Sequence, residues 1–86
     1  MTSATAIESS WIRKTPGVQG GDPCIRNTRI TVHGIVEWKR LGRTDDQIIQ
    51  SIIGLTPADL EETWRYYEQH RKEIDEIIRL EAEESP

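Results

Sequence analysis

The feature that most constrains this chain is a change in the spacing of its apolar residues at Val32. From Val32 to Leu41 the apolar residues recur near the spacing of one face of an α-helix. Before Val32 they form short runs separated by Pro and Gly, which is typical of short strands and tight turns. The sequence therefore predicts a mainly α fold that is preceded by a short N-terminal β-ribbon.

Thr and Gly residues divide the helical part of the chain. Gly42 is placed to end the first helix in the left-handed conformation that Gly favours. Thr44 is an N-cap, and Gln47 three residues later completes a capping-box pattern. Thr56 is a second N-cap, followed by Pro57 at the favoured first position of a helix. These residues predict helices over 32–41, 45–53 and 57–69.

Another apolar stripe follows the third predicted helix, at Ile74, Ile77 and Ile78. No Gly or Pro lies between Tyr67 and Ile74, so the sequence leaves open whether this is a fourth helix or a continuation of the third. The second and third helices, joined by a Gly-Leu-Thr turn, have the dimensions of a helix-turn-helix. The expected organisation is a flexible arm over 1–9, a ribbon and helical domain over 10–70, and an acidic amphipathic helix and tail over 71–86.

The ribbon is expected to contain three short extended pieces. They lie near residues 11–15, at Cys24–Ile25 and at Arg29–Val32. A two-stranded ribbon is marginally stable by itself, so it must pack on the helices or pair with a second copy. We therefore expect a homodimer or a higher homo-oligomer.

The formal net charge of −4 conceals a division along the chain. Residues 1–43 hold seven Lys or Arg and three Asp or Glu, whereas residues 44–86 hold four and twelve. A basic surface can meet phosphate, and an acidic surface can meet a basic protein. The candidates for nucleic-acid contact are the ribbon cations, with an ordinary solvated ribbon as the alternative: Arg13, Lys14, Arg26 and Arg29.

The third predicted helix is not expected to lie in a DNA groove. In a helix-turn-helix the start of the second helix contacts the base edges. Asp59, Glu61 and Glu62 lie near that start here, and DNA phosphates would repel them.

Neither a metal site nor a cofactor site is predicted, and enzyme activity is not expected. Metal sites need clustered Cys and His ligands, but the chain has one cysteine, Cys24, and its two histidines are far apart. A lone cysteine fits a reducing compartment. The sequence has no apolar run long enough to span a membrane and no secretory signal, so we expect a cytoplasmic protein.

The acidic end of the chain is a candidate partner-binding surface. Apolar residues at positions i, i+3 and i+4 fit the way an amphipathic helix lies in a partner's groove. Acids beside them favour a basic partner. The alternative is that these isoleucines close the core or a homodimer. The candidate contact residues are Ile74, Ile77, Ile78, Arg79, Glu73 and Glu76.

The run from Ile12 to Val32 resembles the signature of the family known as domain of unknown function 433. The resemblance extends over roughly residues 10–80, and its motif comprises Gly20, Gly21, Thr28, Arg29 and Ile30. It implies a three- to four-helix homeodomain-like helix-turn-helix domain behind the ribbon. It also implies a VapB-like antitoxin, of the kind often encoded beside a PIN-like ribonuclease toxin.

These observations lead to two functional hypotheses. In the first, the chain is the antitoxin of a type II toxin–antitoxin system. Its acidic C-terminal helix blocks a PIN-like ribonuclease, and Arg79 pairs with the carboxylates of the nuclease's metal site. In the second, the chain is a stand-alone dimeric transcriptional regulator that binds operator DNA. A structural oligomer with neither partner is a third alternative.

Overall fold

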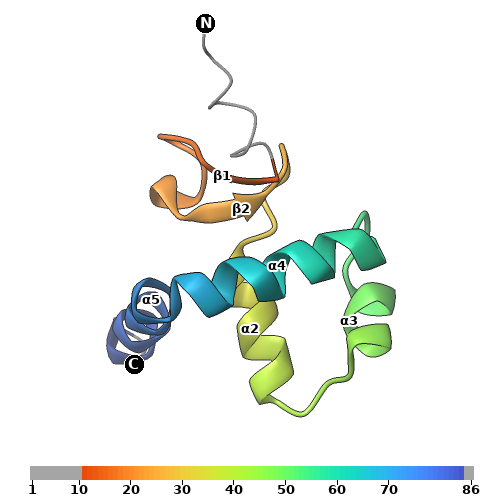
Figure 1. The fold of residues 1–86 in the computed structure, drawn as a ribbon. Helices are drawn as coiled ribbons and strands as arrows, with labels where there is room; N and C mark the ends of the chain where they lie inside the picture. Colours follow the sequence, from red (N-terminus) through yellow and green to blue (C-terminus); the bar gives the residue numbers. More distant parts are fainter. Residues whose placement is uncertain (1–10, 85–86) are drawn as a thin grey trace, which may run out of the picture.

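A computed structural model describes residues 11–84 as a short β-hairpin followed by four helices (Figure 1). The elements in chain order are β1 (Ile12–Lys14), η1 (Gln19–Gly21), β2 (Pro23–Ile25), α2 (Val32–Arg40), α3 (Asp45–Ser51), α4 (Pro57–Gln69) and α5 (Arg71–Glu84). The predicted mainly helical fold with an N-terminal ribbon is confirmed. The predicted arm over 1–9 lies outside the described residues. Within 11–84, the helices are too short or too polar to cross a membrane.

The hairpin has two strands, β1 and β2, which pair antiparallel. The third extended piece, predicted at Arg29–Val32, is not a strand. Thr28 closes a tight turn instead, because its hydroxyl donates to the Ile25 carbonyl at 2.6 Å and accepts from the Ile30 N–H at 3.1 Å. After this turn the pairing is reduced to an isolated β-bridge at Thr31, and α2 begins at the next residue.

The N-caps predicted from the sequence start α3 and α4. Thr44 and Thr56 each form a complete capping box, with Gln47 and Asp59 as the reciprocating residues. Each box satisfies two backbone N–H groups that a helix start would otherwise leave unpaired. The helix predicted over 57–69 is confirmed at both ends.

The first two predicted helices end one and two residues later than the helices of the structure. The helix predicted over 32–41 ends at Arg40. Gly42, at φ +93°, follows the C-cap of α2 as expected for a left-handed terminator. The helix predicted over 45–53 is shorter, because Ile52 is extended and α3 ends at Ser51.

α4 and α5 are separate helices, a point that the sequence leaves open. The break lies at His70, whose φ of −130° and ψ of 37° are not helical. The His70 N–H donates to the carbonyls of Tyr66 and Tyr67, and its ring stacks on that of Tyr66 at a centroid distance of 3.9 Å. The chain therefore turns at a residue that is neither Gly nor Pro, and α5 packs against α2.

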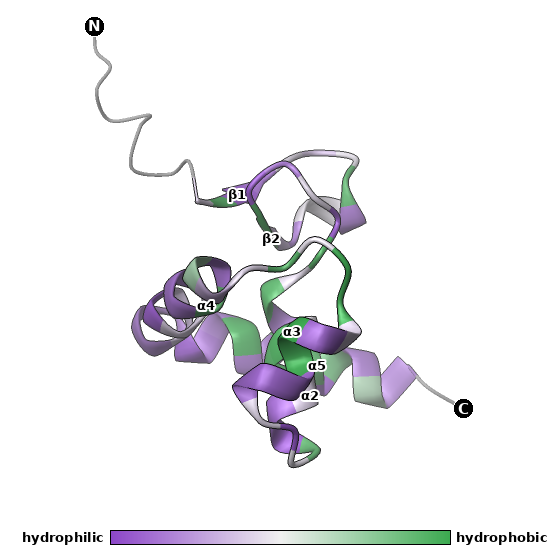
Figure 2. Cartoon of the chain, turned by 90° about the vertical axis from the view of Figure 1, so that its right-hand side faces the viewer, coloured by the Kyte–Doolittle hydropathy of each residue, from purple (hydrophilic) through white to green (hydrophobic). Residues whose placement is uncertain are grey.

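A single core joins the described hairpin to α2–α5. Its buried side chains include Ile25 from β2, Ile35 from α2, Ile48 from α3, Leu60 from α4 and Ile74 from α5. Figure 2 shows hydrophobic segments of α2, α3 and α5 gathered in the middle of the helical part. Because α5 contributes to this core, the C-terminal helix is packed into the same body as the hairpin.

Candidate partner-binding surface

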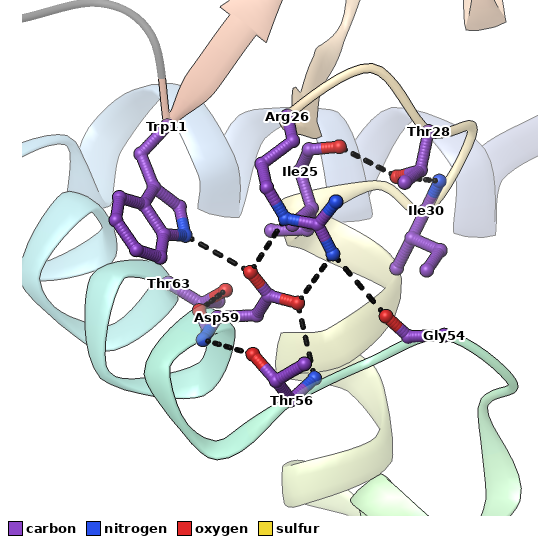
Figure 3. Close-up of polar contacts among 9 residues, drawn as sticks. All are labelled: Trp11, Ile25, Arg26, Thr28, Ile30, Gly54, Thr56, Asp59 and Thr63. Atoms are coloured by element: carbon purple, nitrogen blue, oxygen red, sulfur yellow. Dashed lines mark hydrogen bonds and ion pairs between the residues drawn. The ribbon is translucent and has the colours of Figure 1, made fainter.

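A buried carboxylate, that of Asp59, joins the hairpin to the helices (Figure 3). Its Oδ1 accepts from the indole Nε1 of Trp11 at 3.0 Å and from Nε of Arg26 at 2.9 Å. Its Oδ2 accepts from Nη2 of Arg26 at 2.7 Å and from the backbone N–H of Thr56 at 3.0 Å. Arg26 also donates to the Gly54 carbonyl at 3.2 Å. The hairpin is therefore fastened to the start of α4 by one ion pair and its surrounding hydrogen bonds.

These donors keep the carboxylate ionised. The Arg26 guanidinium holds the pKa of the Asp59 carboxyl well below its usual range, and donors on Thr56 and Trp11 act in the same direction while burial opposes them. The same contact raises the pKa of Arg26. The pair is charged at neutral pH, so the guanidinium predicted to meet nucleic acid is already engaged within the chain.

The other three ribbon cations have different surroundings. Arg13 donates to Oδ1 of Asn27 at 2.7 Å. Nζ of Lys14 lies 2.6 Å from Oε2 of Glu73 on α5, and this hydrogen bond raises the pKa of Lys14. Arg29 is exposed and makes no hydrogen bond or ion pair with another described residue. The four cations thus do not form one free basic cluster.

The remaining motif residues shape the hairpin. Gly20 and Gly21 have φ of +66° and +86°, which a residue with a side chain rarely adopts, in the connection between β1 and β2. Thr28 closes the turn after β2, and Ile30 packs against the core. The motif is therefore explained largely by backbone conformation and packing.

The isoleucine stripe of α5 faces inward. Ile74 is fully buried, so its placement as a partner contact is corrected: it closes the core, which is the alternative that the sequence leaves open. Ile77 and Ile78 are half-buried and pack against the same core. Part of each of these two side chains remains exposed to solvent.

The outward side of α5 carries acids and a leucine. Glu76 and Glu83 are exposed, and Leu80 has 45% of its surface in solvent. Arg79 is ion-paired with both acids within the helix, and it lowers the pKa of the Glu76 carboxyl. The guanidinium predicted to enter a partner's metal site therefore already has two carboxylate partners. Leu80 escapes sequence analysis because it is out of phase with the three isoleucines.

Two other acids fasten α5 to the rest of the chain. Glu73 accepts a hydrogen bond from the Tyr66 hydroxyl at 3.3 Å, besides its ion pair with β1. Oε2 of Glu81 lies 3.0 Å from Nε2 of His33, whose side chain is buried at the start of α2. The predicted contact residue Glu73 is thus engaged in holding the fold.

Beside α5 lies an open, mainly apolar groove that sequence analysis does not identify. It has a volume of about 620 Å³ and runs between α2 and α5. Leu41, the C-cap residue of α2, is one of its lining residues and is 75% exposed. The groove is lined by Gly34, Glu37, Trp38, Arg40, Leu41 and Ile78.

Within the part of the chain that the structure describes, no three His, Cys, Asp or Glu side chains gather as metal ligands would. The Cys24 thiol is buried in β2, and burial raises its pKa.

Comparisons with known proteins point to one family. The family model described as "Protein of unknown function (DUF433)" matches residues 12–67. The crystal structure of a DUF433 member protein from Anabaena variabilis is similar, with a TM-score of 0.79 and 40% sequence identity. The match covers 87% of this chain and 74% of that chain. No curated protein matches this sequence.

Proposed function

The chain belongs to the DUF433 family of proteins of unknown function, and from that premise we propose that it is an antitoxin that binds and blocks a PIN-like ribonuclease. The observation that carries the proposal is the outward side of α5, where exposed acids surround an exposed leucine. In this proposal the chain acts by covering the nuclease and performs no chemistry of its own.

The acidic side of α5 is complementary in charge to the RNA-binding surface of a ribonuclease. A ribonuclease needs basic surface to hold the phosphates of RNA. An acidic helix competes for that surface, and opposite charges speed the encounter of the two proteins. An apolar side chain at the centre of such a contact supplies binding energy when it is removed from water. Leu80 fits this central role, with Glu76 and Glu83 on either side. Arg79 pairs with both carboxylates, so the three charged side chains together leave one net negative charge beside Leu80.

We further propose that α3, α4 and the turn between them form a homeodomain-like helix-turn-helix that serves as a scaffold. The exposed acids Glu61 and Glu68 of α4 would be repelled by DNA phosphates. This helix is therefore better suited to supporting α5 than to entering a DNA groove.

Binding of operator DNA by a homodimer is the second candidate. What favours it is Arg29, a ribbon cation that is exposed and without a hydrogen-bonding partner among the described residues. A gel shift on the upstream DNA that is abolished by Arg29→Glu would support this activity. A gel shift that survives Arg29→Glu would remove the ribbon from consideration.

The proposed function is tested by looking for a PIN-like ribonuclease gene next to this one and by pairing its product with the chain. We expect the two proteins to co-purify and the chain to suppress RNA cleavage by the nuclease. A genome with no nuclease gene next to this one, or cleavage that continues at full rate with excess chain, would contradict the proposal.

A matched pair of variants locates the contact. Leu80→Ser combined with Glu83→Lys should weaken inhibition at least about tenfold, because it removes the apolar centre and reverses a charge. The control is Glu61→Lys on α4, which makes the same charge change on another exposed surface. Equal loss in both variants would mean that overall charge, and not the α5 surface, governs binding.

A further inference from the structure

A small cavity lies on the hairpin, where residues of β1, of β2 and of the turn after β2 line it. Its volume is about 120 Å³, which is above the roughly 10–15 Å³ that one water molecule needs and below the roughly 300–1,000 Å³ of typical small-molecule sites. The cavity therefore suits a single small group and not a whole cofactor. Its lining includes no residue of α2–α5, and its polar residues include Arg13, Thr15, Cys24, Arg26 and Asn27.

The pairing of the two strands explains how these side chains come together. Arg13 lies opposite Cys24 in the register of β1 and β2, so the two side chains share one face of the hairpin. The neighbouring pair, Ile12 with Ile25, lies on the other face and packs on the core. The cavity is thus built on the face of the strands opposite to that of the core isoleucines.

The charged residues that line the cavity are both arginines. Arg13 donates to the neutral Oδ1 of Asn27 at 2.7 Å and forms no ion pair with a described carboxylate. Arg26 uses Nε and Nη2 for Asp59 and for the Gly54 carbonyl, whereas its Nη1 makes no hydrogen bond with a described residue (Figure 3). Guanidinium donors at the cavity are therefore left for a ligand.

Two further charges, one of each sign, lie near the cavity. Burial raises the pKa of the Cys24 thiol, the charge of Asp22 raises it further and the charge of Arg29 lowers it, so both charges are close to this lining residue. The remaining hairpin cation, Lys14, is paired with Glu73 on α5. With the anchor included, three cations face two acids around the cavity, which leaves one positive charge in surplus: Arg13, Arg26 and Arg29 against Asp22 and Asp59.

We propose that this cavity binds a phosphate group, which accepts hydrogen bonds from the Arg13 guanidinium and from Nη1 of Arg26. Guanidinium groups match the oxygens of phosphate in charge and in geometry. The Thr15 hydroxyl and the Asn27 amide also line the cavity and can donate to the same group. The ion pair with Asp59 holds Arg26 in place before a ligand arrives, which lowers the entropic cost of binding. This inference is independent of the antitoxin proposal, because α5 contributes nothing to the cavity.

The test is an NMR titration of the full chain with inorganic phosphate, with sodium chloride holding the ionic strength constant. We expect saturable shifts of the Arg13 side-chain Nε–H and of the backbone amides of Thr15 and Asn27. A second titration uses a short DNA duplex of mixed sequence. Saturation by inorganic phosphate would identify a free phosphate group as the ligand, whereas shifts of the same signals by the duplex alone would assign the phosphate to nucleic acid. No saturable shift of these signals in either titration would overturn the proposal.

Matched variants separate the cavity from overall charge. For the ligand that saturates the signals, Arg13→Gln should weaken binding at least about fivefold, because it removes a charged donor. Thr15→Val, which removes one neutral donor, should weaken it about twofold. The control is Arg65→Gln, the same charge change at an exposed position of α4. Arg26 is left intact, because its loss would also break the anchor to Asp59.

Thermal melts establish that each variant is folded. Retention of wild-type affinity in Arg13→Gln would show that the ligand lies elsewhere and would overturn the proposal. Equal weakening by Arg13→Gln and Arg65→Gln would overturn it as well, since net charge and not the cavity would then attract the anion.

Discussion

Asp59 is the residue through which the hairpin and α4 hold each other. Its carboxylate serves two purposes, because it caps α4 through Thr56 and receives donors from Trp11 and Arg26 on the hairpin. The sequence identifies Asp59 as a position in a capping box and Arg26 as a surface cation. It cannot show that residues 33 positions apart in the chain form an ion pair.

Asp59→Asn should lower the free energy of unfolding by about 2 kcal/mol, because it removes the charge from a buried, multiply hydrogen-bonded group and leaves Arg26 without its counter-ion. Urea denaturation measures this change. The control is Asp46→Asn at an exposed position of α3, where we expect a change within about 0.5 kcal/mol. Equal effects in the two variants would mean that the Asp59 carboxylate contributes no more to stability than an exposed aspartate does.

The ion pair of Asp59 with Arg26 also makes the stability of the fold depend on pH. The pKa of aspartate in an unfolded chain is about 3.9, and the pKa of Asp59 in the folded protein lies well below that value. Its stabilising contribution is therefore fully present above about pH 4 and is lost as the pH falls toward the folded pKa. The stability difference between wild type and Asp59→Asn should shrink between pH 6 and pH 3. A difference that stays constant over this range would contradict the assignment.

The helices differ in how far their ends follow from local sequence. Thr44 and Thr56 determine two helix starts by hydrogen bonds within four residues, so these starts are predicted correctly. The break at His70 depends on stacking with Tyr66 and on the packing of α5 across α2, which are tertiary effects. Without that break the direction of α5 is undetermined, and the stripe that begins at Ile74 can equally well face a partner or the core.

The inward face of α5 is expected to contribute strongly to the stability of the fold, and its outward face very little. Ile74→Ala should cost about 2–5 kcal/mol of stability, as for other buried Ile-to-Ala changes. Leu80→Ala should change stability by less than about 0.5 kcal/mol because Leu80 is exposed. Chemical denaturation of the two variants compares them. A large loss at Leu80 with little at Ile74 would mean that the orientation of α5 is different.

The charge division of the sequence becomes, in three dimensions, a pairing of its two halves. Cations of the N-terminal half lie against acids of the C-terminal half in four ion pairs: Lys14–Glu73, Arg26–Asp59, Lys39–Asp45 and Arg40–Asp75. The net charge of −4 then remains as a surplus of acids. The sequence leaves open whether the charge division makes two working surfaces of opposite sign or an acidic half that is simply a solvated helical surface. In the structure these pairs use cations of the N-terminal half, so the charge that is left over is mainly acidic. Charge counts along the sequence do not show this, because they do not reveal which residues pair across the fold.

The central proposal is that the acids on the outward side of α5 bind a basic protein. The most direct test is the affinity of the full chain for its proposed partner, a PIN-like ribonuclease. It is measured at about 0.05 M and about 0.3 M salt, for wild type and for Glu76→Lys combined with Glu83→Lys. Screening of surface charges should weaken wild-type binding at least about tenfold, mainly through slower association. The double variant should bind weakly at both salt concentrations. Affinity that is insensitive to salt and unchanged by the charge reversal would contradict the claim.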